Sequence, residues 1–404
     1  MGKIKIMTIY KSISSPFNII VALSIAIVLY LARLSSQITS PSFETVFYLI
    51  LNIFGMLLGV ILGSRLKFRS KTKEISFTPK FIPNSNRNLV ILLLCISTLF
   101  FVFEHVVFFE KYGSLPIFNS NFEILRMEFP ISGYIHIIAM AGLIFALPLY
   151  YDYLIYKKNW SNNQKIIVAS LIIINVLLSL LVGNRGGVSL FFVQSLIIYY
   201  SLKQISFRRL LTLVILGAYL LGTAKFVRDY FFSGENIIDQ ISDVWFFGDN
   251  IFLLPVYYCY VTFVMNFEIL NKYIFLLNDF YLGHFSIWLP FESLINKNAY
   301  ELIDLQRDIL KDNFYGVLTA TGFGVPYFDF GYFGVILIFI LSYLLGFIFY
   351  VTYSCGKIYY IPFYSFYMTT FLTLIYTYNF NKLYIWLYLI GLFLIARLYK
   401  EKLN

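Results

Sequence analysis

The chain has 404 residues, of which 59% are hydrophobic and only 13% are charged. A water-soluble protein of this size could not cover its surface with polar groups, so the composition excludes a soluble globular domain and indicates a membrane protein. The net charge of +10 does not indicate nucleic-acid binding, because a basic binding surface needs Lys and Arg clustered with aromatic residues on a soluble face.

About ten continuous apolar segments predict transmembrane helices, since each helix needs about 20 residues to cross a hydrocarbon core. A β-barrel would instead show shorter segments that alternate between polar and apolar residues. The predicted helices lie near 16–34, 43–63, 89–109, 131–153, 165–183, 187–202, 209–226, 332–353, 358–377 and 382–398. We therefore expect an all-α polytopic integral membrane protein with a single transmembrane domain over residues 1–404.

The charge distribution predicts the orientation of these helices. Most of the 31 Lys and Arg residues lie in the N-terminal tail, the loop after the second helix, three later short loops and the C-terminal end. Short cytoplasmic loops retain positive charge, so both termini are expected in the cytoplasm. Most of the 21 Asp and Glu residues then lie on the outer side, and the basic net charge is a signal of topology.

Two predicted outer segments are long, a first loop at 110–130 and a large loop at 227–330 that is partly membrane-associated. Within the large loop, 251–267 and 273–291 are apolar enough to lie in the membrane interface. They could also form a further pair of crossings, which would leave every other orientation unchanged. The expected number of helices is therefore ten to twelve.

Motifs for cofactors are missing from the sequence. It contains no metal-ligand spacing, no phosphate-binding Walker loop and no dinucleotide fingerprint. Cys95, Cys259 and Cys355 are widely separated and are interpreted as packing residues. We therefore expect no cofactor and no metal, so a reaction on the outer side must use substrates that are already activated. Lipid diphosphate-linked sugars fit that requirement.

Two arginines are the main candidates for substrate contact. Arg185 lies in GNRGG at 183–187, between two apolar helices on the outer side, and Arg228 with Asp229 opens the large loop. A guanidinium can hold phosphate through two parallel hydrogen bonds, and glycines allow a ligand to approach the backbone. Together the arginines could bind a diphosphate and stabilise charge on it as a glycosyl bond breaks. The alternatives are an Arg185 that reaches toward lipid headgroups and an Arg228–Asp229 ion pair.

Glycosyl transfer also needs a base that deprotonates the attacking hydroxyl, unless the leaving diphosphate does so. His284, in YLGHFSIWLPFE, is the favoured candidate because a neutral imidazole accepts protons near neutral pH. A histidine among aromatic residues can equally be a packing residue. The other candidates for the base are Asp229, Asp279 and Glu292.

Four further residues are predicted to contact substrate, and the first of them is Asp229, which follows Arg228. Arg126 lies in the first outer loop, and Arg307 lies in the polar run 301–316, which can alternatively be a solvated charged helix face. Asp329 lies in GFGVPYFDFGYFG, where glycines interrupt the entry to a helix. Irregular backbone at membrane depth is typical of a cavity wall, although Asp329 could instead cap the helix that follows.

With these features the sequence resembles the O-antigen and capsule repeat-unit polymerases of the Wzy type. The resemblance rests on the apolar helices, the Gly-flanked Arg185, Arg228 at the start of a large outer loop, and GFGVPYFDFGYFG. It implies a membrane-embedded glycosyltransferase that acts on undecaprenyl diphosphate-linked oligosaccharides at the outer face of the bacterial inner membrane. A growing chain would leave its lipid diphosphate for a hydroxyl of a new repeat unit. The resemblance also implies that Arg185 and Arg228 contact substrate, with membrane lipids, a chain-length regulator and a flippase as partners.

Two other functions stay open at this point. An O-antigen ligase also combines many helices with a large outer loop, but it transfers finished polymer to a lipid core. A flippase or exporter for the same lipid-linked sugars would be expected to show internal repeats or charged residues deep in several helices. The sequence offers only Glu104 as such a residue, near the outer end of its helix.

Overall fold

The computed structural model describes residues 14–65, 84–115, 133–182, 185–203 and 320–400, together with most of 212–292. The described part is built from α-helices and short 3-10 or π-helical turns. The helices of the bundle are α1 (Phe17–Leu31), α2 (Phe43–Arg65), α3 (Asn84–Tyr112), α5 (Gly133–Met140), α6 (Gly142–Tyr156), α7 (Asn162–Leu181), α8 (Arg185–Leu202), Ile215–Val227, α15 (Gly334–Phe349), α16 (Ile361–Leu372) and α17 (Leu383–Lys400). The predicted all-α polytopic class is confirmed.

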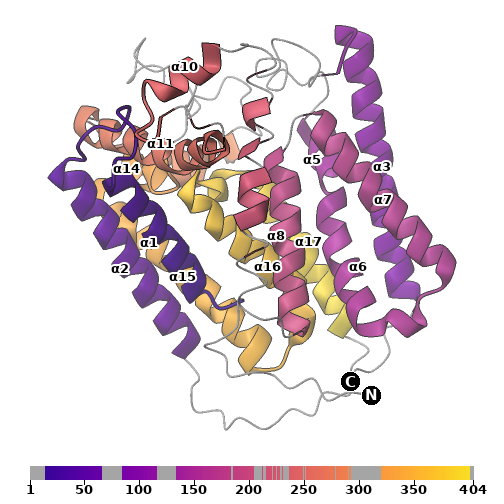
Figure 1. Ribbon diagram of the computed structural model, residues 1–404. Helices are drawn as coiled ribbons and strands as arrows, with labels where there is room; N and C mark the ends of the chain where they lie inside the picture. The colour runs from indigo at the N-terminus through magenta and orange to yellow at the C-terminus, as the bar shows by residue number, and fades with distance from the viewer. Residues whose placement is uncertain are drawn as a thin grey trace.

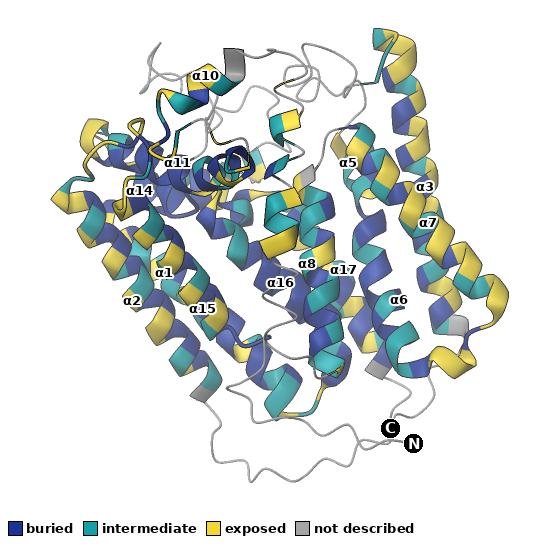
Figure 2. Cartoon of the chain, in the orientation of Figure 1, coloured by how far each residue is buried: buried dark blue, intermediate teal, exposed yellow. Residues whose placement is uncertain are grey.

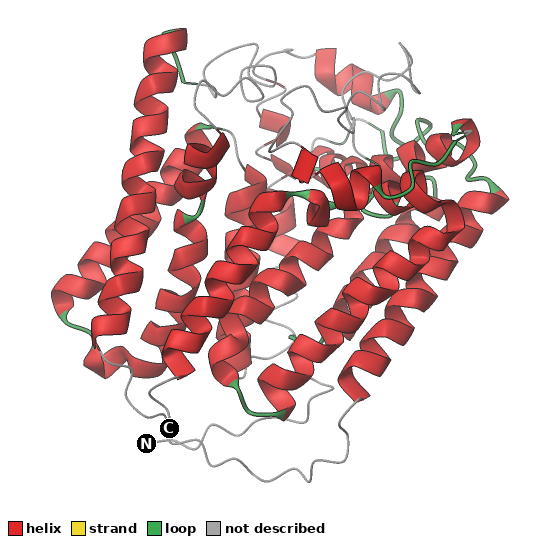
Figure 3. Cartoon of the chain, turned by 180° about the vertical axis from the view of Figure 1, so that it is seen from behind, coloured by secondary structure: helices red, strands yellow, loops and turns green. Residues whose placement is uncertain are grey.

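The bundle has two ends, which Figures 1 and 3 show from opposite sides. We call one the tail end, where α1 begins and α17 finishes. The other is the loop end, where α3 finishes and α8 begins. It also carries α10 (Asn236–Ser242), α11 (Leu254–Leu276), the π-helical turn His284–Trp288 and α14 (Gly324–Phe330). Most of the non-bundle structure is thus at one end.

Every predicted apolar segment overlaps a helix of the structure, and within the described residues six helices are long and apolar enough to span a membrane. These six are Phe43–Ser64, Asn86–Tyr112, Gly133–Asn159, Asn162–Leu181, Gly324–Ser354 and Ile358–Ile375. Shorter apolar helices at Phe17–Leu31, Gly186–Leu202, Ile215–Val227 and Leu383–Tyr399 account for the other predicted segments. The segment predicted at 131–153 is divided at Ala141 into α5 and α6.

Small residues bring α2 and α15 into close contact. A Cβ on Gly59 would lie 2.6 Å from the carbonyl oxygen of Phe339, and a Cβ on Gly346 would lie 2.6 Å from that of Val60. Gly55 and Gly63 continue the same face of α2 at four-residue spacing. Glycine at this spacing lets two membrane helices approach backbone to backbone, which increases the van der Waals contact between them.

Helix α11 runs crosswise to the bundle at the loop end (Figure 1). The connection between α1 and α2 follows it over about three turns, because Leu34 N–H donates to the Tyr260 hydroxyl and Ser42 N–H donates to Asn271 Oδ1. A loop at one end of the bundle can accompany a helix in this way only if the helix lies along that end. The two apolar stretches that sequence left as a possible pair of crossings thus contain one crosswise helix and the turn after it.

Large apolar side chains on the outward faces of the bundle are exposed, as Figure 2 shows for α2, α3 and α7. Phe54 on α2 is 62% exposed, Leu99 on α3 is 68% exposed and Ile166 on α7 is 65% exposed. Aqueous solvent would make such surfaces unfavourable, whereas lipid tails are as apolar as these side chains. The exposed bands are therefore the faces that lipid covers.

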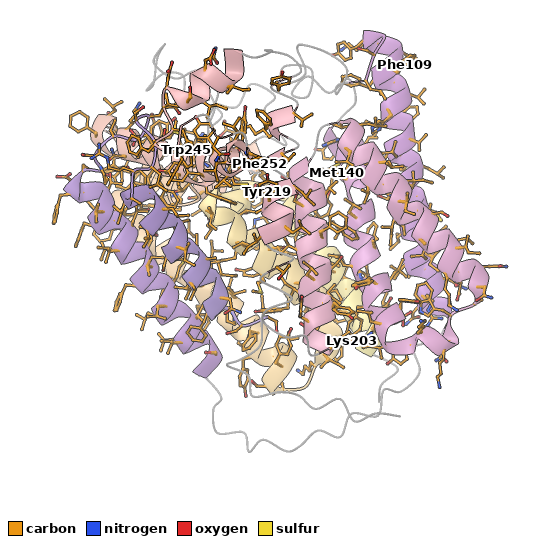
Figure 4. The ribbon with its side chains drawn as sticks, in the orientation of Figure 1. Phe109, Met140, Lys203, Tyr219, Trp245 and Phe252 are labelled. Atoms are coloured by element: carbon orange, nitrogen blue, oxygen red, sulfur yellow. The ribbon has the colours of Figure 1, made fainter. Side chains whose placement is uncertain are left out.

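Charges are distributed unequally between the two ends. Among the acidic residues that the structure describes, only Asp152 lies at the tail end, where it forms a buried ion pair with Arg87. Basic residues such as Lys157, Lys158 and Lys203 lie at the tail end, and Figure 4 labels the last of them there. This asymmetry is the one that the positive-inside rule relates to membrane orientation.

Candidate functional site

The turn that carries Arg185 lies at the loop end beside α3 and α5. Helix α8 begins at Arg185, three residues after Val182, which ends α7. Val182 is buried in a small apolar cluster with Phe101 of α3 and Ala139 of α5. The backbone at Arg185 is therefore placed within about 11 Å of that cluster, the reach of three residues.

A carboxylate–histidine pair joins α3 to α5 next to this turn. Glu104 Oε1 lies 2.6 Å from His136 Nδ1, and the Glu104 side chain is fully buried while that of His136 is 32% exposed. The neighbouring His105 ring contacts the backbone carbonyls of Phe101 and Leu178. Tyr388 of α17 donates its hydroxyl to the carbonyl of Ile137. Four helices thus meet around the Glu104–His136 pair.

Asp329 holds the turn that carries His284. Its side chain is buried in α14, where Oδ1 accepts the Phe285 N–H at 3.1 Å and Oδ2 accepts the Ser286 N–H at 2.6 Å. Two backbone bonds extend this contact, from Tyr281 N–H to the Phe328 carbonyl and from Leu282 N–H to the Asp329 carbonyl. Asp329 therefore caps a π-helical turn from a different segment, not the helix that follows it. Its predicted contact with substrate stays a prediction.

Backbone geometry shows why the turn at His284 needs particular residues. Gly283 has φ +93° and Gly331 has φ +57°, a region that glycine adopts without strain. A Cβ on Gly331 would lie 2.7 Å from the Phe280 ring. Leu282 also has a positive φ, +49°. Gly283 and Gly331 thus let α14 and the segment of the His284 turn pack closely, and Gly331 is one of the glycines that the sequence analysis interpreted as interrupting the entry to a helix.

His284 has a carboxylate neighbour of its own. Its Nδ1 lies 3.5 Å from Glu292 Oε2, and the two side chains are 26% and 36% exposed. Asp279, another candidate base, is exposed on the connection between α11 and this turn. Tyr378 lies near Asp329, and burial, together with that carboxylate, raises the pKa of the Tyr378 phenol above its ordinary value. The phenol therefore stays neutral, with its proton available to donate.

Polar side chains of α11 are engaged by the α1–α2 connection. Both oxygens of the buried Glu268 accept hydrogen bonds from Thr39, one from its N–H and one from its hydroxyl. Asn271 Oδ1 accepts from the Thr45 hydroxyl at 2.7 Å. Ser40, Ser42, Asn271 and Lys272 line a shallow pocket of about 260 Å³ here. This network fastens α11 across the loop end.

The helix that leads to Arg228 packs against the start of α11. Cys259 Sγ contacts the Ala218 carbonyl at 3.0 Å, and Lys225 Nζ lies 5.2 Å from the centre of the Tyr258 ring. Figure 4 labels Tyr219 of this helix next to Phe252, and the Tyr219 hydroxyl donates to the Phe252 carbonyl. This helix ends at Val227, and Arg228 is the next residue in the sequence.

The structure brings together only some of the predicted site residues. It describes His284 and Asp329 on neighbouring segments, and it places the backbone of Arg185 at the start of α8. The predicted contacts Arg126, Arg228, Asp229 and Arg307 lie outside the described residues. Sequence reasoning did not assign a role to His136, although a histidine in an apolar run within reach of an intramembrane Glu104 was a usable signal.

Comparison with protein families decides the class of protein. A model of the O-antigen polysaccharide polymerase Wzy family matches residues 4–402, nearly the whole chain. The chain belongs to this family. At the level of the family it is a glycosyltransferase-like O-antigen polymerase and a multi-pass bacterial membrane protein. Neither the comparison with curated proteins nor that with solved structures gave a match.

Proposed function

We propose that this Wzy-family protein joins undecaprenyl diphosphate-linked oligosaccharide repeat units into O-antigen or capsular polysaccharide at the outer face of the bacterial inner membrane. The growing chain leaves its lipid diphosphate and is transferred to a hydroxyl of an incoming repeat unit. The loop end faces outward, both termini are cytoplasmic, and the chain forms one membrane domain from which 110–130 and 227–330 project outward.

One observation carries the proposal beyond the family level. Arg185 begins a bundle helix at the loop end, which is the acidic end of the described residues and the end away from the basic short loops. Positive charge at the outer end of a membrane helix runs against the positive-inside bias. A guanidinium in that place can bind phosphate through two parallel hydrogen bonds.

The predicted site residues have different proposed roles in the reaction. Arg185 and Arg228 bind the donor diphosphate and stabilise the negative charge that builds up on it as the glycosyl bond breaks. Arg126, Asp229 and Arg307 contact the sugars or the diphosphate, and Asp329 supports that contact by holding the His284 turn. His284 is the base predicted from sequence alone. The donor is already activated, so the reaction needs neither a nucleotide nor a metal, and chelators should leave its rate unchanged.

A complementation experiment tests the assignment of the arginines. Cells that lack the protein should accumulate single lipid-linked repeat units, and the wild-type chain should restore a ladder of long polymer. Arg185→Ala and Arg228→Ala should each abolish long polymer at equal protein level, with Lys111→Ala as a control at the same end of the bundle. Normal ladders from both arginine variants would contradict the proposed site.

The same experiment separates this proposal from ligation and transport. Loss of a ligase leaves finished polymer on its carrier, whereas loss of a polymerase leaves single repeat units. A chain-length regulator and a flippase are the expected partners, since polymer length and the supply of repeat units lie outside the transfer step. Loss of this protein should therefore leave repeat units on the outer side of the membrane, where loss of a flippase would leave them inside.

A further inference from the structure

The Glu104–His136 pair lies inside the membrane-spanning region and has no part in the assignments above. Glu104 is fully buried in α3, and its Oε2 has no hydrogen-bond partner among the described residues. Glu268 and Asp329 differ, because both oxygens of each accept hydrogen bonds from backbone N–H groups or from a hydroxyl that position a loop. Ionisable side chains within a membrane span are costly and are typically retained for function.

Helix geometry places this pair and the start of α8 at Arg185 on the same side of one apolar cluster. Phe101, Ala139 and Val182 meet in one buried cluster, which Met140, labelled in Figure 4, also contacts. Helices α3 and α7 run toward the loop end and α5 runs away from it. Glu104 therefore lies nearly one turn beyond Phe101 toward the loop end, and His136 lies nearly one turn before Ala139 in the same direction. Arg185 follows Val182 on that same side.

The pair has the arrangement of an oriented imidazole base. In a neutral imidazole one ring nitrogen carries the proton and the other accepts, so a Nδ1–H that donates to Glu104 makes Nε2 the accepting nitrogen of His136. The carboxylate also stabilises the imidazolium that forms when Nε2 takes a proton. We propose that His136 is the proton acceptor for the attacking hydroxyl in chain extension, with Glu104 as its positioning residue. This inference rests on the proposed function.

The step balances without any further reactant. The hydroxyl oxygen of the incoming repeat unit forms a bond to the anomeric carbon of the growing chain, and its proton passes to His136 Nε2. The bond between that anomeric carbon and the diphosphate oxygen breaks, and its electron pair leaves with the lipid diphosphate. Stabilising that leaving group is the role proposed for Arg185, which begins α8. The proton then leaves His136 for water or for the released diphosphate.

The structure favours His136 over His284 as the acceptor. His284 is on a turn that α14 holds, and its carboxylate neighbour Glu292 is partly exposed at 3.5 Å. His136 instead has a buried carboxylate at 2.6 Å, and its helix α5 shares an apolar cluster with the end of α7, just before the turn that carries Arg185. Among the described residues, Glu104 of α3 contacts His136 directly, and Tyr388 of α17 lies near Glu104 and donates to the carbonyl of Ile137. His105 of α3 and Tyr134 of α5 are the titratable residues next to the pair in the sequence.

The test compares variants of the purified full-length protein in vesicles that contain undecaprenyl diphosphate-linked repeat units. His136→Gln should slow chain extension at least about 100-fold, since a positioned proton acceptor contributes about 10²–10⁴-fold. It should also remove the rise in rate with pH that an imidazole base gives between about pH 5 and 8. Added imidazole should restore part of the rate of His136→Ala, but none of the rate of Arg185→Ala.

Ser97→Ala is the matched structural control. The Ser97 hydroxyl donates to the Ile138 carbonyl at 2.6 Å and ties the same two helices without a titratable group, so its variant should keep the wild-type rate and pH profile. A His136→Gln protein with an unchanged rate and profile, or a Ser97→Ala protein that loses as much activity, would overturn the inference. The inference would also be overturned if His284→Gln lost the whole rise in extension rate with pH. A wild-type protein that extends no chains would instead contradict the proposed function itself.

Discussion

Two regions at the loop end use carboxylates in different ways. In the region of α11 and α14, Asp329 and Glu268 accept hydrogen bonds from neighbouring segments and hold those segments in place. In the region of α3, α5 and α7, Glu104 is bonded to another ionisable side chain, His136. Both regions bury carboxyl groups, which is costly unless the groups are hydrogen-bonded or paired. All of these carboxyl groups are buried, so burial does not distinguish their roles. We distinguish them by their partners, which are backbone N–H groups and a hydroxyl in the first region and an ionisable side chain in the second.

This difference has a consequence for how the site works. The α11–α14 region is a fixed layer whose polar groups hold one another, which suits the positioning of a substrate. The α3–α5 region contains a pair that can exchange a proton, and it adjoins the turn of Arg185. Substitutions in the first region should therefore change stability, and substitutions in the second should change rate.

Asp329→Ala should give the largest effect, and it tests whether the carboxylate of Asp329 holds the His284 turn in place. The change leaves the buried N–H groups of Phe285 and Ser286 without an acceptor, at about 1–3 kcal/mol each. Their amide hydrogen exchange should speed up more than tenfold, because the His284 turn opens more often. Asp329→Asn keeps one acceptor oxygen and should show a smaller change. Unaltered exchange in Asp329→Ala would show that the carboxylate does not hold the turn.

Glu104→Gln should reduce the rate of chain extension by about 10- to 100-fold while the protein stays folded, a smaller loss than that of His136 itself. The amide oxygen can still accept from Nδ1–H, but the negative charge that stabilises the imidazolium is lost. The measurement is the extension rate in vesicles, with unfolding temperature as a check on the fold. Glu268→Gln is the control, and it should lower the unfolding temperature without a comparable loss of rate. A large loss of rate in Glu268→Gln with little loss in Glu104→Gln would contradict a chemical role for Glu104 and a structural role for Glu268.

Gly331→Ala should destabilise the α11–α14 region by about 1–2 kcal/mol, the usual cost of a left-handed backbone for a residue with a Cβ. The new methyl group would also meet the Phe280 ring. Gly391→Ala is a matched control, because apart from the adjoining backbone of α17 no atom of the described residues lies within 4 Å of a Cβ at that position, and it should be neutral or slightly stabilising. Thermal unfolding in detergent measures both, and equal stabilities would mean that the close contact at Gly331 is not required.

Glu292→Gln should have the smallest effect, less than about 1 kcal/mol of stability, because partly exposed ion pairs contribute little. The His284–Glu292 pair is longer and more exposed than the Glu104–His136 pair. Extension rates and unfolding temperatures of Glu292→Gln and Glu104→Gln in parallel give the comparison directly. A rate loss in Glu292→Gln as large as that in Glu104→Gln would indicate that His284, and not His136, is the proton acceptor.

The sequence predicted the bundle well for a simple physical reason. A helix that crosses lipid must be apolar over about 20 residues, and this requirement appears directly in the chain. It predicted α11 less well, because a crosswise helix at the membrane surface is almost as apolar as a spanning one. Its direction follows from contacts such as Thr39 with Glu268 and Thr45 with Asn271, which lie more than 200 residues apart in the sequence.

The candidate site was predicted only in part for a similar reason. Arg185 is visible in sequence because a charge between apolar helices is unusual, and the structure places its backbone at the start of α8. The role of Asp329 depends on a segment about 43 residues away, at Phe285 and Ser286. The pairing of Glu104 with His136 depends on how α3 and α5 pack. Such contacts come from tertiary structure, which spacing alone does not encode.

The most direct test of the central claim uses the purified chain in vesicles with undecaprenyl diphosphate-linked repeat units and no nucleotide, ion gradient or other protein. If this Wzy-family protein is itself the polymerase, the carrier-linked oligosaccharides should lengthen into a ladder, and Arg185→Ala vesicles should keep single repeat units. Repeat units that cross the bilayer without growing, or that stay unchanged with the folded wild-type protein, would contradict the account.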